Sequence, residues 1–200
     1  MNLIETIKIE NGKVYNLKWH NKRCNKSRFE LFNKKSPINL KDYITNFPKK
    51  GLFRCRIVYS RDILSVKYIP YTIKRNKSFK IVSSNIDYRY KYSNREELNK
   101  LKENNILYDE VMIEKNGFLT DTTIANIAFF NGKEWITPKK PLLEGTLRAK
   151  LLDKKILVKK DIKSDSLKHF SHYALMNAMI GFQIQKNITI YINTKEKICL

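Results

Sequence analysis

The segment from Tyr108 to Lys155 restricts the fold more than any other part of the chain. It contains three short runs in which apolar and polar residues alternate, Glu110–Ile113, Ile124–Phe130 and Glu134–Thr137. The pairs Asn116-Gly117 and Asn131-Gly132 separate these runs. Alternation interrupted by Asn-Gly pairs is typical of antiparallel strands joined by tight turns. The segment therefore predicts an antiparallel sheet.

A helix is expected directly after this sheet. Pro138 and Pro141 interrupt strand pairing, Gly145 follows, and residues Thr146 to Lys155 carry leucines at helical spacing. The first N–H groups of a helix have no intrahelical partner and form a natural binding site for anions. The sequence therefore predicts an anion site where Gly145 leads into the helix.

The composition indicates a globular protein. Two hundred residues, 42% of them hydrophobic and 12% aromatic, suffice for one full core or two small ones. No apolar run approaches the roughly 20 residues that cross a bilayer, and the first residues lack a basic head followed by an apolar stretch. We therefore expect a cytoplasmic protein. Cys24, Cys55 and Cys199 are odd in number and widely spaced, which predicts reduced thiols.

The net charge of +21 raises the question of nucleic-acid binding. The lysines are scattered over the whole chain among many Asn and Ile residues, a mixture that A/T-rich codon usage also produces. Specific nucleic-acid binding is therefore disfavoured, and the same positive field would attract a small anionic substrate.

The first part of the chain predicts a small α+β domain. A hairpin is expected from Asn2 to Leu17, with Leu3, Glu5, Ile7 and Ile9 on one face of its first strand, followed by a helix at Trp19–Phe32, a short helix capped by Asn39, and strands at Leu52–Tyr59 and Ile63–Tyr71. The polar stretch TIKRNKS then suggests a boundary, with domains at residues 1–77 and 78–200.

In the first long helix, Arg23 and Cys24 follow His20 by three and four positions, so the three lie on or near one face. For His20 and Cys24, packing or solvent exposure is favoured over metal binding, because nothing completes a ligand set. Spacing alone leaves the role of Arg23 open.

The second part continues with a helix at Arg95–Asn104, for which Ser93 or Asn94 could be the cap. Lys91 precedes it between two tyrosines, and composition gives this lysine no special status. Further on, Asn177 lies in an apolar run and is either a hydrogen-bonded turn residue or a donor beside a ligand.

Several blocks of the sequence resemble the class IV aminotransferase family, the fold type IV pyridoxal-phosphate enzymes. The blocks are LTDTTIANIAFFNGKEWITP, PLLEGTLRAKLL, YKYSNREEL, LMNAMIGF and the opening LIETIKIENGK with WHNKR. The resemblance implies a mixed α/β (α+β) fold of two small domains like D-amino-acid aminotransferase, with pyridoxal 5'-phosphate at the domain and dimer interface of a homodimer. It makes residues 78–200 the cofactor-binding domain.

The resemblance also implies roles for individual residues. Lys91 becomes the lysine that forms the Schiff base, and Asp121 becomes the carboxylate that pairs with the pyridine nitrogen. The remaining implied cofactor-binding residues are Arg23, Asn126, Gly145, Thr146, Leu147, Asn177 and Ala178. No metal site is expected.

The chain departs from the family pattern at two positions, with Asp121 in place of the usual Glu and Glu144 where Pro is common. YKYSNREEL and LMNAMIGF resemble 4-amino-4-deoxychorismate lyase, which forms 4-aminobenzoate and pyruvate for folate synthesis from a small anionic amine. Two alternatives are a branched-chain or D-amino-acid transaminase, and a catalytically impaired member that binds polyanions through its basic surface.

Overall fold

Two compact units make up the fold. The computed structural model describes residues 1–193 and 196–200. Unit 1 contains Met1–Ile73 and Arg89–Asn94, and unit 2 contains Lys74–Tyr88 and Arg95–Leu200. The chain thus leaves unit 1 after Ile73 and returns to it for one short segment. The sequence-based domains, 1–77 and 78–200, stay a prediction. They do not include the return of residues Arg89–Asn94 to unit 1.

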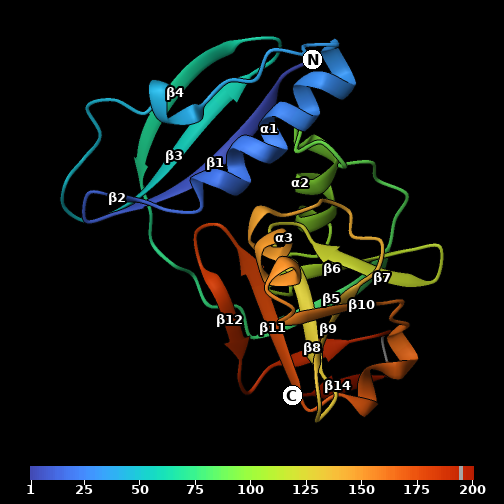
Figure 1. Ribbon diagram of the computed structural model, residues 1–200. Coiled ribbons are helices and arrows are strands. Elements are labelled where there is room, and N and C mark those ends of the chain that lie inside the picture. Colours follow the sequence, from blue (N-terminus) through green and yellow to red (C-terminus); the bar gives the residue numbers. More distant parts are fainter. Residues whose placement is uncertain (194–195) are drawn as a thin grey trace. The chain divides into compact units, whose positions relative to one another are not determined.

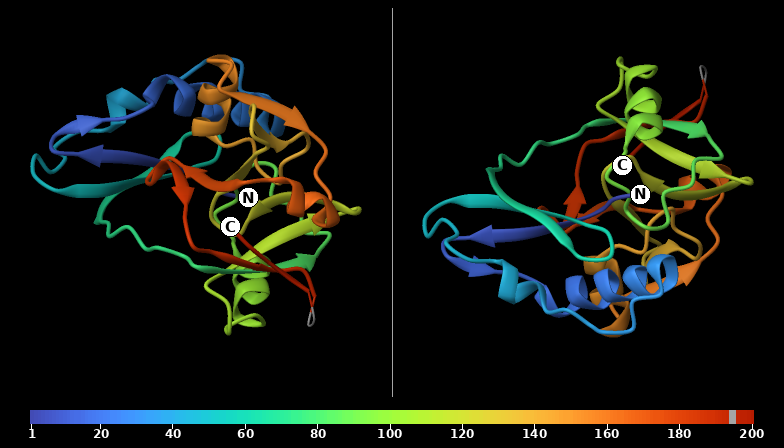
Figure 2. Two further views of the ribbon diagram at one scale, coloured as in Figure 1. Left: turned by 90° about the horizontal axis from the view of Figure 1, so that it is seen from below. Right: turned by 90° about the horizontal axis from the view of Figure 1, so that it is seen from above.

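Unit 1 is an antiparallel sheet with helices on one face. Its elements are β1 (Leu3–Glu10), β2 (Lys13–Val14), α1 (Leu17–Phe32), a 3₁₀ helix (Leu40–Tyr43), β3 (Leu52–Tyr59) and β4 (Ile63–Pro70). The strand order is β2-β1-β3-β4. In two views, α1 lies along one side of these strands (Figures 1 and 2).

The alternating pattern of β1 explains this arrangement. Leu3, Ile7 and Ile9 are fully buried and pack with Cys55 and Ile57 of β3. Because side chains alternate across a strand, one face of the sheet is apolar and is covered by α1. The expected hairpin, helix and strands are confirmed, and the Asn39 side chain accepts from Lys41 N–H as a cap should.

Unit 2 is built around a long mixed sheet. Its elements are β5 (Ser78–Ser83), α2 (Glu96–Glu103), β6 (Glu110–Lys115), β7 (Phe118–Thr122), β8 (Asn126–Phe130), β9 (Trp135–Pro138), α3 (Thr146–Asp153), β10 (Leu157–Lys160), a 3₁₀ helix (Ser164–His169), β11 (His172–Asn177), β12 (Gly181–Gln185), β13 (Thr189–Tyr191) and β14 (Lys197–Cys199). The order is β10-β9-β8-β7-β6-β5-β13-β14, and β11 pairs with β8 and β12.

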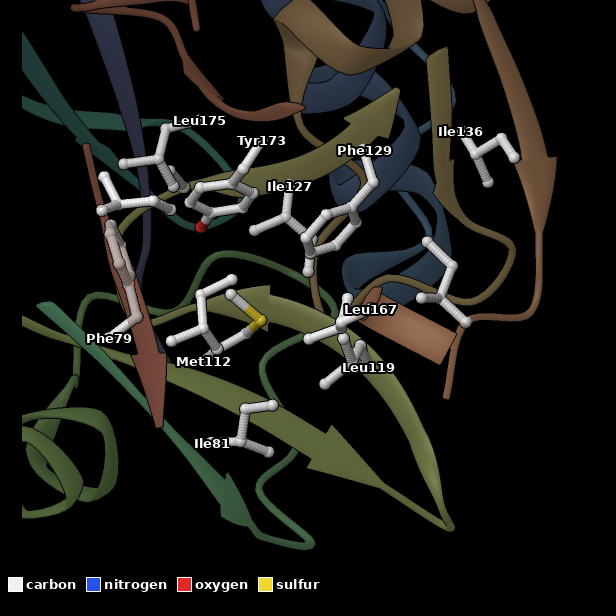
Figure 3. Close-up of a cluster of buried hydrophobic side chains, with 14 residues drawn as sticks. Phe79, Ile81, Met112, Leu119, Ile127, Phe129, Ile136, Leu167, Tyr173 and Leu175 are labelled. Atoms are coloured by element: carbon white, nitrogen blue, oxygen red, sulfur yellow. The ribbon is translucent and has the colours of Figure 1, made fainter. Parts of the chain in front are cut away.

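Large apolar side chains from several strands fill the interior of unit 2 (Figure 3). Tyr173 of β11 packs edge-on against Phe79 of β5 and lies beside Phe129 of β8, with ring centroids 5.1 Å apart in both pairs. Met112 of β6 and Leu119 of β7 belong to the same cluster. This core holds β7 and β8 in place, and the facing ends of these strands carry Asp121 and Asn126.

The antiparallel sheet expected within Tyr108–Lys155 is confirmed, with one refinement. It contains four strands, because residues 118–122 form β7 between the predicted runs. The helix α3 begins at Thr146 as expected. The predicted cap of α2 was wrong. The N-cap is Arg95, whose side chain makes no capping hydrogen bond and instead donates to the Thr123 carbonyl (2.7 Å).

Within the described ranges, no helix is long and apolar enough to cross a membrane.

Candidate active site

The turn between β7 and β8 places Asp121 opposite Asn126. Thr122 Oγ1 accepts from the N–H groups of Ile124 (3.3 Å) and Ala125 (3.0 Å), and Thr122 N–H donates to the Ala125 carbonyl (2.9 Å). Side-chain bonds of this kind are a usual way in which threonine stabilises a turn. The turn is tight, so Asp121 and Asn126 pair directly across the strands, and both are buried.

Both side chains hold the loop that leads to α3. Asn126 Nδ2 donates to Asp121 Oδ1 (2.7 Å) and to the Leu143 carbonyl (2.8 Å). Leu143 N–H donates to Asp121 Oδ2 (2.8 Å). One carboxylate and one amide thus satisfy the backbone of a residue that lies far along the chain, and they fix the position from which α3 starts.

Gly145 is required at the start of α3 for reasons of space. Its φ of −65° and ψ of 143° are open to any residue. A Cβ at this position, however, would overlap Asn126 Oδ1 and lie 3.1 Å from Asn126 Cγ. The glycine therefore permits Asn126 to lie directly against the helix start.

The first turn of α3 has the features of an anion site. Thr146 and Leu147 are its first residues, both are buried, and the turn contains no acidic residue. N–H groups of a first helical turn point out of the helix end, where the helix dipole favours negative charge. Thr146 and Leu147, which the sequence predicts as phosphate ligands, thus lie at a suitable helix start.

Asp121 is a buried acid with an unusual ionisation. Burial raises its pKa to about 7, although hydrogen bonds from Asn126 and Leu143 and the charge of Arg148 oppose the rise. Arg148 is also buried and donates to Thr137 Oγ1 (3.2 Å) and the Pro138 carbonyl (2.7 Å). Arg148 was not predicted as a functional residue, although it lies in the block PLLEGTLRAKLL that resembles the family.

Asn177 lies at the turn between β11 and β12. Its Oδ1 accepts from the N–H groups of Met179 (2.9 Å) and Ile180 (3.0 Å), and its Nδ2 donates to the Ile124 carbonyl (3.2 Å). The side chain is therefore a turn residue, one of the two alternatives that the sequence left open. A role in cofactor binding for Asn177 and Ala178 stays a prediction.

In unit 1, a buried carboxylate joins the first strand to the first helix. Glu5 of β1 is fully buried, and its Oε2 lies 2.6 Å from His20 Nδ1. Arg23 donates to the same carboxylate twice, from Nε to Oε1 (2.8 Å) and from Nη2 to Oε2 (2.6 Å). Paired, planar contacts of this kind are the strongest hydrogen bonds that arginine makes.

The environment sets the ionisation of this group. Burial alone would raise the pKa of Glu5, but the Arg23 charge and the His20 hydrogen bond outweigh it and bring the pKa to about 2. Burial lowers the pKa of His20, and Glu5 offsets part of that effect. Within residues 1–193 and 196–200, no group of three or more His, Cys, Asp or Glu side chains is placed to hold a metal ion.

Glu5 was not predicted as a site residue. The signal was present, because its position in the alternating pattern of β1 places it on the apolar face with Leu3 and Ile7. A carboxylate on such a face needs a buried partner. Arg23 is that partner, and its predicted contact with phosphate stays a prediction.

Lys91 lies beside the start of β1, in unit 1. Its carbonyl accepts from Ile4 N–H (3.1 Å), and Ser93 N–H donates to the Asn2 carbonyl (2.9 Å). Its φ is 46°, and every other described non-glycine residue with positive φ is an asparagine except Lys155, just past the end of α3. A lysine held in the left-handed region away from a helix end is a strained position of the kind found at active sites.

The family model for amino-transferase class IV matches residues 2–188. The chain belongs to the class IV aminotransferase family. The match covers both units, and the predicted mixed α/β fold of the family is confirmed.

Individual relatives of this class IV chain agree with the family. A protein of unassigned function from Haemophilus influenzae is 37% identical over 90% of this chain and 98% of its own length. A solved structure of a candidate 4-amino-4-deoxychorismate lyase from Haemophilus somnus is 39% identical, covers 90% of this chain and 97% of that chain, and has a TM-score of 0.83. A candidate aminodeoxychorismate lyase from Schizosaccharomyces pombe is 30% identical over 58% of this chain and 54% of its own.

Class IV aminotransferases are pyridoxal-phosphate-dependent enzymes, and the residues of this chain fit that cofactor. A solved structure of a hypothetical aminotransferase from Mycobacterium tuberculosis in its PLP-bound form shares the fold at 12% identity and a TM-score of 0.72. In this chain, a glycine-led helix start suits a phosphate, and Lys91 supplies an amine on a strained backbone. Asp121 supplies a buried carboxylate, and two of its donors come from Asn126 and Leu143.

Proposed function

We propose that this enzyme is a pyridoxal-phosphate-dependent lyase that converts 4-amino-4-deoxychorismate to 4-aminobenzoate and pyruvate. The observation that carries the proposal is the 39% identity to the candidate lyase from Haemophilus somnus, which extends over 90% of this chain and 97% of that one. The product 4-aminobenzoate is a precursor of folate, which gives the reaction a place in folate synthesis.

In this proposal, the phosphate of the cofactor binds at the start of α3, next to Thr146 and Leu147, and Lys91 is the site of covalent attachment. Arg23 is the expected cationic partner of the phosphate, held in one orientation by Glu5. Asn126 maintains the loop geometry, and the turn of Asn177 and Ala178 completes the set of predicted ligands.

When bound, pyridoxal phosphate supplies an electron sink at the carbon that bears the substrate amine. The amine of Lys91, freed when the substrate amine takes its place on the cofactor, would be the base that removes the proton from that carbon. Loss of this proton allows the six-membered carbon ring of the substrate to become aromatic. At the same time the C–O bond between that ring and the enolpyruvyl group breaks, and the group leaves as pyruvate. When Asp121 is ionised, its carboxylate balances positive charge near the pyridine ring of the cofactor.

The assay is direct. Purified enzyme with pyridoxal phosphate and 4-amino-4-deoxychorismate, without any amino acceptor, should release 4-aminobenzoate and pyruvate in equal amounts. Lys91→Ala should abolish product formation. Lys35→Ala changes an exposed lysine of the same unit and should leave activity unchanged. A strict requirement for 2-oxoglutarate would instead identify a transaminase, the alternative that the family name supports.

Cofactor binding has its own test. Borohydride reduction of the loaded protein, followed by peptide mapping, should place a pyridoxyl group on Lys91. A protein that takes up no pyridoxal phosphate and retards nucleic acid in a salt-sensitive manner would favour the impaired, polyanion-binding alternative. We also expect a homodimer, which light scattering after size-exclusion chromatography measures.

A further inference from the structure

The segment that carries Lys91 leaves unit 2 and returns to it within a few residues. Tyr88 is the last residue of unit 2 before the segment, Arg89–Asn94 belong to unit 1, and Arg95 is the first residue of unit 2 after it. The middle of the segment is held by β1 through the backbone bonds of Lys91 and Ser93. Its two ends are a separate part of its support, and they lie in unit 2.

The side chain of Arg95 joins these two ends. Arg95 Nη1 donates to the Tyr88 hydroxyl (3.2 Å), and Arg95 Cζ lies 5.4 Å from the centre of the Tyr88 ring. A guanidinium over a tyrosine ring at this distance is a favourable cation–π contact. The main chain of Arg95 is fixed as well, because its carbonyl accepts from the N–H of Asn99 in α2 (2.8 Å). The segment therefore starts and ends at one closed base, formed by Tyr88 and Arg95.

The same guanidinium reaches the turn that carries Asp121. Arg95 Nη2 donates to the Thr123 carbonyl (2.7 Å), and Thr123 is two residues after Asp121. Thr123 is also held from its side chain, because its Oγ1 donates to the buried carboxyl group of Glu110 (2.6 Å). One side chain thus links the base of the Lys91 segment to the turn of Asp121, and every contact of this bridge lies within unit 2.

Both acceptors of Arg95 are uncharged. In the part of the chain that the structure describes, Arg95 forms no ion pair, and its two donors go to a phenol and to a backbone carbonyl. The guanidinium is planar and rigid, so it can span two separate acceptors, whereas a lysine carries a single ammonium on a flexible stem. A bridging role therefore requires arginine, and a role that depends on charge alone would also be filled by lysine.

The backbone of Lys91 depends on support of this kind. Its φ of 46° lies in the left-handed region, where a side chain of this type stays only when its surroundings determine the conformation. The turn of Asp121 is different, because the hydroxyl groups of Thr122 and Thr123 hold it without Arg95. Loss of the Arg95 side chain should therefore free the Lys91 segment and leave the turn in place.

We propose that Arg95 is a positioning residue for the lysine that carries the cofactor. By closing the base of residues 89–94, it holds the Lys91 amine ready to condense with the aldehyde of pyridoxal phosphate. In that step a C=N bond replaces the C=O bond, and the aldehyde oxygen leaves as water with two hydrogens of the amine. The assignment of Lys91 as the attachment site rests on the proposed function, whereas the bridge through Arg95 does not.

Hydrogen exchange of the full-length, cofactor-free enzyme tests the bridge. In Arg95→Gln, the amides of residues 89–94 should exchange about tenfold faster or more, because two hydrogen bonds from a charged donor are lost, while those of β6 should exchange as in the wild type. Arg95→Lys should behave like Arg95→Gln. The matched control is Lys100→Gln, which removes an exposed cation of the same helix that pairs with Glu96 (2.8 Å), and it should leave the segment unchanged.

Attachment of the cofactor gives a readout that general destabilisation would not give. Borohydride added at a series of times after pyridoxal phosphate measures how fast Lys91 acquires a pyridoxyl group, and both Arg95 variants should slow this by about tenfold or more. Deoxypyridoxine phosphate has a methyl group in place of the aldehyde and cannot attach. It should bind both variants within about twofold of the wild-type affinity, because its expected contacts at the start of α3 do not involve Arg95.

Three results would overturn the proposal. The first is wild-type exchange of residues 89–94, or wild-type attachment rates, in both Arg95 variants. The second is rescue of exchange and attachment by Arg95→Lys, which would assign the effect to charge and not to the bridge. The third is an equal loss of deoxypyridoxine phosphate affinity and attachment rate, which would identify a general disruption of the fold.

The proposed function and the role of Arg95 fail separately. An enzyme that attaches pyridoxal phosphate at Lys91 more slowly in the Arg95 variants, but forms no 4-aminobenzoate, would refute the lyase and retain the positioning role. Formation of 4-aminobenzoate by a wild-type enzyme whose Arg95 variants show unchanged exchange and attachment would retain the lyase and refute the role of Arg95.

Discussion

Substitution of Gly145 by alanine tests how the start of α3 is built. The backbone at this position is open to alanine, so any loss must come from the overlap of the new Cβ with Asn126 Oδ1. Asn126 can move only if it gives up its hydrogen bonds to Asp121 and to the Leu143 carbonyl. The expected loss is therefore the value of those two bonds.

The magnitude follows from the bonds involved. A bond to a charged group contributes about 1.5–3 kcal/mol and a neutral one about 0.5–1.5 kcal/mol, so Gly145→Ala should lower the free energy of unfolding by roughly 2–4 kcal/mol. With Asn126→Ala already present, the overlap is absent. Gly145→Ala should then be neutral, or stabilising by about 0.5 kcal/mol through reduced freedom of the unfolded chain.

Urea unfolding of the wild type, both single variants and the double variant gives the coupling energy directly. In a Trp19→Phe background, the fluorescence of Trp135 reports on unit 2, where both substitutions lie. The coupling should be about 2–4 kcal/mol. Equal losses from Gly145→Ala in the two backgrounds would refute the argument that the glycine exists to accommodate Asn126.

Three further predictions concern charge and strain. Glu5→Gln should lower the free energy of unfolding at pH 7 by about 3 kcal/mol, because the pKa of Glu5 is depressed from 4.5 to about 2. That deficit should shrink as pH falls from 4.5 toward 2, where wild-type Glu5 also becomes protonated, and a deficit independent of pH in urea titrations would contradict it. For Asp121, whose pKa is raised from 3.8 to about 7, the folded state binds the proton more tightly, so the stability of the cofactor-free enzyme should fall by up to about 4 kcal/mol as pH rises through this window. Asp121→Asn should remove that slope, and an identical pH profile in the variant would exclude Asp121 as its source. Finally, Lys91→Asn should be more stable than Lys91→Ala by up to about 1 kcal/mol, since asparagine tolerates positive φ, and equal urea midpoints would show that position 91 is unstrained.

Local patterns in the sequence predicted much of the fold. Alternation, Asn-Gly turns and proline positions identified the strands around Gly117 and Gly132, and helical spacing identified α1 and α3, because these signals act over a few residues. The sequence did not show that Arg89–Asn94 returns to unit 1, since that depends on pairing with a strand far away in the chain.

The candidate site was predictable where a motif is contiguous. Gly145, Thr146 and Leu147 lie at a helix start as expected. The pairing of Glu5 with Arg23 and the engagement of Asp121 by Leu143 were not predicted, because each joins residues that only the tertiary fold brings together. A charged residue on the apolar face of a strand was the one sequence signal that could have found the first of these.

The two backbone bonds that tie the Lys91 segment to Asn2 and Ile4 have a practical consequence. They tie Lys91, with its positive φ, to the first strand of unit 1. The pairing of β1 and the backbone conformation of the lysine are therefore coupled, so a substitution that loosens the start of β1 should release the strain at Lys91 before it unfolds the rest of unit 1.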